Sequence, residues 1–494
     1  MEQSIRKKTT LNVVFNFISQ AMTLIIPLIT TPYLSRVLHE EGNGQYSFAV
    51  SIITYFILAA NLGCDIYGQR QIAAHQSDYK EKSNVFWEIF IIKLVCTAIS
   101  LIVLYSLLFT TGFGDKYTLL ITILSIQVIA VPFDIQFLFR GLEKFKSIAI
   151  RTLVMKLIGL ICIFLFVKTE NDVWIYTLCI SVSTILSNLL LWISIRKNVG
   201  FVSIKDLHFL KHIKPIIIIF LPTLAFTIYT VFDRTMIGLL APNPEYENGC
   251  YEQAYKLNNI IMLFITVMSS VFVSRNSVDY KSGNIESLKN NLKFSINYVW
   301  FIGIPLLFGT IVMSKSISSW FFGEGYEIVP LLLIIMGTRY LTSGLGDVLG
   351  NQLFVVIQKE KYTLIAVFTA AIFNVVLNYF LIKEYGAIGA AISTAISELI
   401  VTLIFVFFAI KNKYLNLADI FIHFFKPLIS SVIMLVPIYF LNDIFPYSIW
   451  SFILIVFIGI IIYVSCNIIL KEKTTLFLWK AFTKKIGGLK NDKQ

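Results

Sequence analysis

Long apolar stretches dominate the 494-residue sequence and constrain its fold more than any other feature. About fourteen of them lie near residues 11–31, 46–63, 86–110, 117–139, 148–167, 173–195, 215–241, 257–274, 294–314, 328–350, 363–382, 386–410, 425–441 and 449–470. A helix crosses a hydrocarbon core with about 20 apolar residues, and only helices or closed barrels satisfy their backbone in lipid. Because these stretches are too long and continuous for barrel strands, the sequence predicts an all-α polytopic membrane protein.

Composition supports this class and argues against an enzyme. The chain is 57% hydrophobic and only 14% charged, whereas soluble domains carry about 25% charged residues. We find no P-loop, G-x-S-x-G or H-E-x-x-H motif, and every connection is too short for a soluble catalytic domain. The five His and six Cys are scattered, so we expect no cofactor, no metal site and no disulfide.

The basic residues are distributed unevenly between alternate connections. With the N-terminus on side one, connections on that side hold about 31 of the 41 Lys and Arg residues, against about 6 on the other. The positive-inside rule therefore predicts that both termini are cytoplasmic. The Lys-rich C-terminal tail is expected to attract anionic lipid, and nucleic acid is not implied.

The two halves of the sequence look related. "DIQFLFRGLEKFKSIAI" and "DVLGNQLFVVIQKEKYTLIA" occupy corresponding helix junctions. This similarity predicts an N-lobe (1–200, helices 1–6), a C-lobe (201–412, helices 7–12) and a remainder (413–494, two further helices and the tail). Parallel repeats of this kind place a substrate site near the bilayer midplane and expose it to each side in turn.

An ordered set of motifs carries a family resemblance over about residues 5 to 412. They are "TTPYLSRVLHEEGNGQYSFAVSIITYF", "FLFRGLEKFK", "DRTMIG", "GCYEQAYKLNNI", "FFGEGYE" and "YGAIGAAISTAISE". The sequence resembles Wzx-like polysaccharide flippases of the multidrug/oligosaccharidyl-lipid/polysaccharide exporter superfamily. The resemblance implies two six-helix lobes around a central cavity, two extra helices, and export of lipid-linked repeat units such as those of O-antigen or capsule.

The deepest charges in the predicted helices are candidates for a cavity site, because a charge at mid-bilayer needs a partner or water. Arg339 lies near the centre of the tenth helix, either facing the cavity or paired with Asp347 or Glu398. Glu398 is the deepest carboxylate and is also a candidate for proton coupling.

Five further charges lie at intermediate depth in four helices. Arg234 either faces the cleft or snorkels outward, beside Asp233 as a pairing group. Lys93 and Lys156 either snorkel or form an electropositive entrance, and Asp134 could neutralise either one.

The remaining candidates are a boundary charge and a group of amides. Arg36, in the outer extension of the first helix, is an interfacial anchor or gating residue. Amides that could contact glycan, or simply hold helices together, are Asn12, Asn16, Gln20, Asn258 and Asn259.

Cations in an apolar cleft suit an anionic cargo. A polyprenyl-pyrophosphate-linked oligosaccharide carries about two negative charges that Lys or Arg can bind. The sequence thus predicts a flippase for this substrate in the bacterial cytoplasmic membrane, working with a polysaccharide polymerase and chain-length machinery. The alternative is an ion-coupled multidrug antiporter of the same superfamily; a polymerase would show a larger outer loop.

Overall fold

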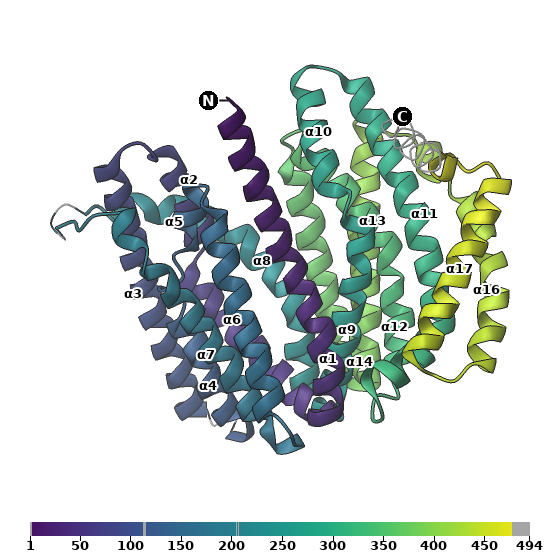
Figure 1. The fold of residues 1–494 in the computed structure, drawn as a ribbon, viewed down its shortest axis with the longest axis horizontal. Helices are drawn as coiled ribbons and strands as arrows, with labels where there is room; N and C mark the ends of the chain where they lie inside the picture. Colours follow the sequence, from purple (N-terminus) through teal and green to yellow (C-terminus); the bar gives the residue numbers. More distant parts are fainter. Residues whose placement is uncertain (1, 112–114, 204, 206, 477–494) are drawn as a thin grey trace, which may run out of the picture. The chain divides into compact units, whose positions relative to one another are not determined.

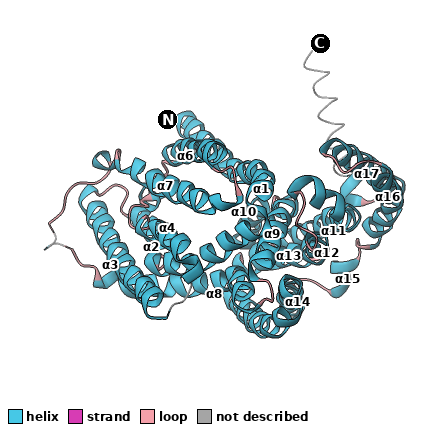
Figure 2. Cartoon of the chain, turned by 90° about the horizontal axis from the view of Figure 1, so that it is seen from below, coloured by secondary structure: helices cyan, strands magenta, loops and turns pink. Residues whose placement is uncertain are grey.

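Every regular element of the described residues is a helix in the computed structural model, so the all-α prediction is confirmed (Figure 2). The structure describes residues 2–111, 115–203, 205 and 207–476, but not the side chains of residues 2–24, 111, 115, 225, 226 and 229. The first eight helices are α1 (Glu2–Asn61), α2 (Cys64–Ala74), α3 (Tyr79–Thr111), α4 (Thr118–Ile129), α5 (Gln136–Gly141), α6 (Phe145–Phe166), α7 (Val173–Trp192) and α8 (Leu210–Leu240).

The later helices complete the chain (Figure 1). They are α9 (Pro244–Thr266), α10 (Ser269–Lys281), α11 (Ile285–Ile317), α12 (Val329–Gly337), α13 (Arg339–Leu349), α14 (Glu360–Lys411), α15 (Leu417–Phe421), α16 (Phe425–Ile444) and α17 (Ile449–Ile469). Short 3₁₀ turns are η1 (Asp115–Tyr117), η2 (Glu170–Asp172) and η3 (Ile195–Lys197), and π-helical turns are η5 (Ser318–Phe322) and η6 (Gly350–Val355).

The predicted spans coincide with these helices. Ten helical segments of the described residues are long and apolar enough to cross a membrane. Each predicted range overlaps a helix, and α1 and α14 hold two ranges each. The count of fourteen and the cytoplasmic position of the termini stay predictions.

Two long helices bend at a single residue. In α1 the bend is at His39, whose φ of 52° lies in the left-handed region, and in α14 it is at Gly386, also with φ 52°. Asn43 Nδ2 donates hydrogen bonds to the carbonyls of Leu34 (3.1 Å) and His39 (2.7 Å), satisfying carbonyls that a helix end leaves open. Each bend therefore joins two predicted spans without an extended loop.

The helices form two compact units. Unit 1 is Met1–Leu239 with Asn243–Gly249, and unit 2 is Leu240–Pro242 with Cys250–Gln494. The predicted lobe boundary near residue 200 falls inside unit 1, and the assignment of helices to two six-helix lobes stays a prediction.

Unit 1 is a bundle in which α1 packs against α3, α4 and α6, while α4 and α6 also pack against α7. Its core includes the fully buried Ile121 and Leu124 of α4. Large apolar side chains also face outward, such as Phe109 of α3, which exposes 82% of its surface. Exposed apolar surface of this kind is expected where helices meet lipid tails.

Glycines bring two distant segments of unit 1 into backbone contact. A Cβ on Gly44 would lie 1.7 Å from the carbonyl oxygen of Glu245, and a Cβ on Gly249 would lie 1.9 Å from that of Glu40. No side chain fits at either position. This contact explains the second glycine of "EEGNGQYS" and the glycine of "ENGCYE".

Unit 2 is built around α11, which packs against α10, α12, α13 and α16. Helix α17 packs on α16, and the Tyr463 hydroxyl donates to the carbonyl of Phe301 in α11 at 2.6 Å. The two C-terminal helices, for which the sequence predicts no role, are thus fastened to the unit through α11.

Candidate functional site

A cavity of about 890 Å³ lies within unit 1, lined by residues of α1, α5, α6 and α7 and by Asp134. Among the described residues, its charged lining consists of three basic residues, Arg140, Arg151 and Lys156, and one acidic residue, Asp134. The apolar part of the wall includes Ile26, Pro27, Phe145, Ile148, Met155, Leu160, Ile163 and Ile180. The cavity therefore combines a basic excess with an apolar surface.

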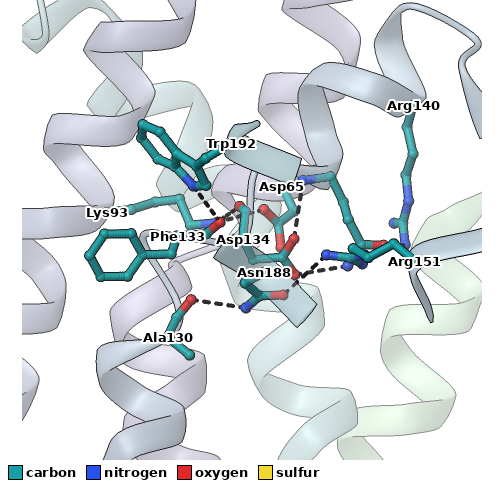
Figure 3. A network of polar contacts seen from close by, with 10 residues as sticks. Asp65, Lys93, Ala130, Phe133, Asp134, Arg140, Arg151, Asn188 and Trp192 are labelled. Atoms are coloured by element: carbon teal, nitrogen blue, oxygen red, sulfur yellow. Dashed lines mark hydrogen bonds and ion pairs between the residues drawn. The ribbon is translucent and has the colours of Figure 1, made fainter. Parts of the chain in front are cut away.

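Arg151 is the most buried of these cations, with 7% of its surface exposed. Its Nη1 donates to the carbonyl of Ser187 (2.9 Å) and to Asn188 Oδ1 (3.3 Å). Asn188 is held in turn by donating to the carbonyl of Ala130 at 3.0 Å (Figure 3). The buried Nε of Arg151 has no hydrogen-bond partner among the described residues. Arg151 is thus fixed by neutral oxygens and keeps a donor available.

Gln136 links the carboxylate of Asp134 to Arg140. Its Nε2 donates to Asp134 Oδ2 at 3.0 Å, and its Oε1 accepts from Arg140 Nη2 at 3.1 Å. Arg140 is exposed, and Lys156 is half-buried one turn and a half along α6 from Arg151. The Gln136 amide thus lies between the Asp134 carboxylate and the Arg140 guanidinium. Arg140 remains part of the cavity lining.

Lys93 lies behind this region and is completely buried. Its Nζ contacts Asp65 Oδ1 at 2.9 Å and the backbone carbonyl of Asp134 at 2.8 Å (Figure 3), and it lies 5.6 Å from the ring centroid of Phe137. The sequence suggested the carboxylate of Asp134 as its partner. In the structure the carboxylate comes from Asp65, because α2 brings that residue against α3.

Arg339 forms a second charged cluster, inside unit 2. Its Nη2 lies 3.4 Å from Glu398 Oε1 in α14, and its Nη1 donates to Asn258 Oδ1 of α9 at 3.3 Å. The guanidinium also lies 5.3 Å from the ring centroid of Tyr255. The Arg339 and Glu398 side chains are each 12% exposed. Of the two predicted partners, Asp347 and Glu398, the structure shows Glu398 in contact with Arg339.

Asp347 and Arg36 have other hydrogen-bond partners. Asp347 accepts a hydrogen bond from Asn351 at 2.7 Å, and Arg36 is exposed and donates to the carbonyl of Pro32 at 2.9 Å. Asn259 is half-buried beside Asn258. The side chains of Asn12, Asn16 and Gln20 lie outside the described residues.

Asp233 and Arg234 belong to unit 1 through α8. Asp233 is buried and Arg234 is half-buried. The backbone carbonyl of Arg234 accepts from Asn248 Nδ2 at 2.7 Å, and neighbouring Thr235 donates to Ser51 at 3.0 Å. This part of α8 is therefore tied to α1 and to the start of α9 by neutral hydrogen bonds.

A separate acidic centre holds the beginning of α8. The fully buried Glu88 accepts from His212 Nε2 at 2.6 Å and from the backbone N–H of His208 at 2.6 Å, and it pairs with Lys211 at 3.1 Å. His212 Nδ1 lies 2.7 Å from the hydroxyl of Tyr67. Burial lowers the pKa of His212, although its hydrogen bond to Glu88 opposes that shift. Among the described residues no His, Cys and carboxylate groups gather as a metal site.

Arg151 is the functional candidate that sequence reasoning missed. It lies only three residues from the start of the predicted span 148–167, so it does not stand out as a deep charge, although it lies two turns inside α6. A signal was present: Ile148, Arg151, Met155 and Gly159 recur at helical spacing on one face, and all four are buried. A basic residue within a buried stripe indicates an internal polar contact.

Comparison with known proteins supplies matches over most of the chain. Residues 10–273 match the family described as "Polysaccharide biosynthesis protein", and residues 257–458 match "Lipid II flippase MurJ". A putative O-antigen transporter of Escherichia coli (strain K12) is 23% identical over 411 residues, covering 82% of this chain and 97% of that protein.

Two solved structures share the fold. Lipid II flippase MurJ in an inward closed conformation has a TM-score of 0.71 and 18% identity, over 93% of this chain and 98% of that one. An inward-facing multidrug resistance MATE family transporter of the MOP superfamily has a TM-score of 0.61 and 15% identity, over 79% and 98%. These similarities confirm the predicted fold class.

Proposed function

The chain belongs to the polysaccharide biosynthesis protein family, and on this premise we propose that it is a flippase for a polyprenyl-pyrophosphate-linked oligosaccharide. It would carry this repeat unit from the cytoplasmic to the outer leaflet for surface polysaccharide synthesis. The names of its relatives, an O-antigen transporter and a lipid II flippase, support this substrate class. We assign it transport by alternating access and no catalytic reaction.

The observation that carries the proposal is the basic excess of the unit 1 cavity. A pyrophosphate offers oxygens that accept charge-assisted hydrogen bonds from Arg and Lys. Arg151 can donate to them without first breaking an ion pair, because its present partners are neutral oxygens. Arg140 and Lys156 add positive charge at the same cavity, and its apolar wall suits the lipid part of the cargo.

The second cluster is proposed as a switch that the cargo or a proton operates. Arg339 is a cargo-binding candidate only while Glu398 is displaced, and the 3.4 Å separation makes that contact a weak one. Protonation of Glu398 would also release Arg339, which is how this carboxylate would couple transport to H⁺. Asn258 and Asn259 are proposed glycan contacts on α9, with Asn12, Asn16 and Gln20 on α1.

Two predicted residues take different roles in this proposal. Lys93 is a structural residue rather than a cargo ligand, because Asp65 and a backbone carbonyl already use its charge. Arg234 and Asp233 are proposed as cleft-lining and pairing groups of α8.

The membrane potential favours export of such a cargo. Moving one charge through 100 mV is worth about 2.3 kcal/mol, so two negative charges moved outward against an inside-negative potential gain roughly 4–5 kcal/mol. The location we propose is the bacterial cytoplasmic membrane, with polysaccharide polymerase and chain-length machinery as partners.

The competing function is an ion-coupled multidrug antiporter, which shares this fold. Cationic drugs would be repelled by the three basic residues of the unit 1 cavity, where Asp134 is the one opposing carboxylate among the described lining residues. The cavity charge therefore favours the anionic cargo.

The test is complementation of a deletion strain in the native host. Wild-type protein is expected to restore surface polysaccharide, whereas Arg151→Ala leaves lipid-linked oligosaccharide on the cytoplasmic side despite normal membrane levels. Arg196→Ala is the matched control, because Arg196 is exposed and does not line the cavity. Unchanged polysaccharide in the deletion strain, together with increased sensitivity to cationic dyes, would establish the antiporter instead.

A further inference from the structure

A second cavity, of about 790 Å³, lies within unit 2 and shares no residue with the Arg339 cluster. Its lining comes from α10 and α11, from α15 and the turn that follows it, and from residues 473–474 after α17. The proposed transport function does not use it.

One part of this cavity is polar and basic. Arg275, Lys293 and Lys473 line it, with Asp419 as the acidic residue. Lys293 pairs with Asp419 at 2.8 Å, whereas Arg275 and Lys473 are exposed and have no ion pair within the described part of the chain. Two positive charges therefore remain available to an anion.

A neutral polar group faces the same space. The buried Oδ1 of Asn297 has no hydrogen-bond partner among the described residues. A carbonyl oxygen of this kind accepts from a hydroxyl or amine, and both occur in glycerol-based headgroups.

The other part of the cavity is apolar and opens onto exposed apolar surface. Phe272 and Phe294 pack with ring centroids 5.6 Å apart, and Val271 and Ile422 are 59% and 65% exposed. Phe425 at the start of α16 continues this surface and is 64% exposed. A ligand that fills the site thus needs an anionic head and an apolar body.

The walls are held in place by contacts independent of any ligand. Trp300 Nε1 of α11 donates to the carbonyl of Ile420 at 2.7 Å and its ring lies 5.0 Å from that of Phe424, which fastens α15 to α11. The buried carboxylate of Glu472 accepts from the backbone N–H groups of Thr474 (2.8 Å) and Thr475 (2.6 Å). The backbone at Lys473 is therefore fixed beside the cavity.

We propose that this cavity binds the headgroup of an anionic phospholipid, with the acyl chains lying over the exposed apolar surface. Free phosphate would use the two cations alone, whereas a phospholipid uses both parts of the site. The predicted topology places this region at the cytoplasmic leaflet, where anionic lipids attract basic groups. The bound lipid would hold α10, α15 and the segment after α17 together.

Native mass spectrometry of the purified full-length protein tests this site. Phosphatidylglycerol and phosphatidylcholine with identical acyl chains are added separately, and wild-type protein is expected to retain phosphatidylglycerol preferentially. Arg275→Ala/Lys473→Ala is expected to reduce that preference about tenfold. Lys281→Ala/Lys361→Ala is the matched control and retains it, because both residues are exposed and outside the cavity.

Two further measurements separate the sources of the phosphate. Ile422→Gln leaves the charge of the site unchanged and is expected to weaken phosphatidylglycerol retention, while inorganic phosphate at millimolar concentration leaves retention unchanged. Displacement by inorganic phosphate would show a simple anion site and overturn the lipid assignment. Equal retention by wild type and the Arg275/Lys473 double variant would overturn the site itself.

Discussion

The unit 1 cavity and the Arg339 cluster of unit 2 hold their central arginines in opposite ways. Arg151 donates hydrogen bonds to neutral acceptors, Ser187 and Asn188, with the carboxylate of Asp134 near it but not in direct contact, whereas Arg339 contacts the carboxylate of Glu398. A buried cation whose hydrogen bonds go to neutral partners keeps more of its field for an incoming anion than a cation in direct contact with a carboxylate. The difference teaches that depth in the membrane does not by itself identify a binding residue.

The largest expected effect is at the cations of the unit 1 cavity. Arg151→Gln/Lys156→Gln removes two charge-assisted donors, each worth about 1.5–3 kcal/mol, so transport should fall about 100-fold or more. Translocation of a lipid-linked oligosaccharide in proteoliposomes is the measurement. An Arg196→Gln variant serves as the control, and equal loss in that variant would remove the distinction.

A large loss of stability is expected where a cation is structural. Lys93→Met leaves Asp65 without its ion pair and a carbonyl without its donor, and we expect about 2–3 kcal/mol of destabilisation. The value lies below that for fully buried pairs because the Asp65 side chain is 30% exposed. Thermal unfolding in detergent measures it beside Lys80→Met, whose side chain is exposed. A Lys93→Met protein as stable as that control would contradict a structural role.

A smaller effect is expected at the paired arginine. Glu398→Gln should destabilise by about 1–2 kcal/mol, because Arg339 then loses its charge partner in a nearly closed site. Arg339→Met/Glu398→Gln should recover part of that loss, since no charge is left uncompensated. A double-mutant cycle of unfolding free energies provides the test. Strictly additive effects would show that the 3.4 Å contact between Arg339 and Glu398 contributes no coupling free energy.

The smallest effect concerns His212, a histidine whose charge depends on pH. Burial lowers the pKa of His212 below its ordinary value, so the unfolded chain takes up a proton at a higher pH than the folded one. Stability from this group is therefore present above about pH 6.5 and is lost as pH falls towards the lowered value. Unfolding midpoints between pH 7.5 and 5.5 should fall more steeply for wild type than for His212→Gln. A parallel decrease in both proteins would assign the pH dependence to other groups.

The membrane-spanning helices were predictable because the bilayer imposes a length and a composition that the sequence displays directly. The bends at His39 and Gly386 were not, because a single residue with positive φ leaves no mark on hydropathy. The ranges before and after each bend were predicted as two separate helices. The structure joins each such pair into one kinked helix.

The charged sites were predictable only in part. The sequence pointed to Arg339 and to Glu398 as one alternative partner, since both are deep in their helices. It missed Asp65 as the partner of Lys93, because a carboxylate 28 residues away meets the lysine only through the packing of α2 on α3. Arg151 was missed because helix ends are uncertain by a few residues, and a cation near the start of a predicted span is usually interfacial.

The bends at His39 and Gly386 also bear on how the protein meets its surroundings. Each bend passes the chain from one predicted span to the next through a single non-helical residue, on the side opposite the N-terminus in the predicted topology. Neither bend contains an extended segment that a protease could cleave or an antibody could bind. Epitope tags placed there would interrupt helices rather than lengthen loops, so mapping of exposed segments should miss these two connections.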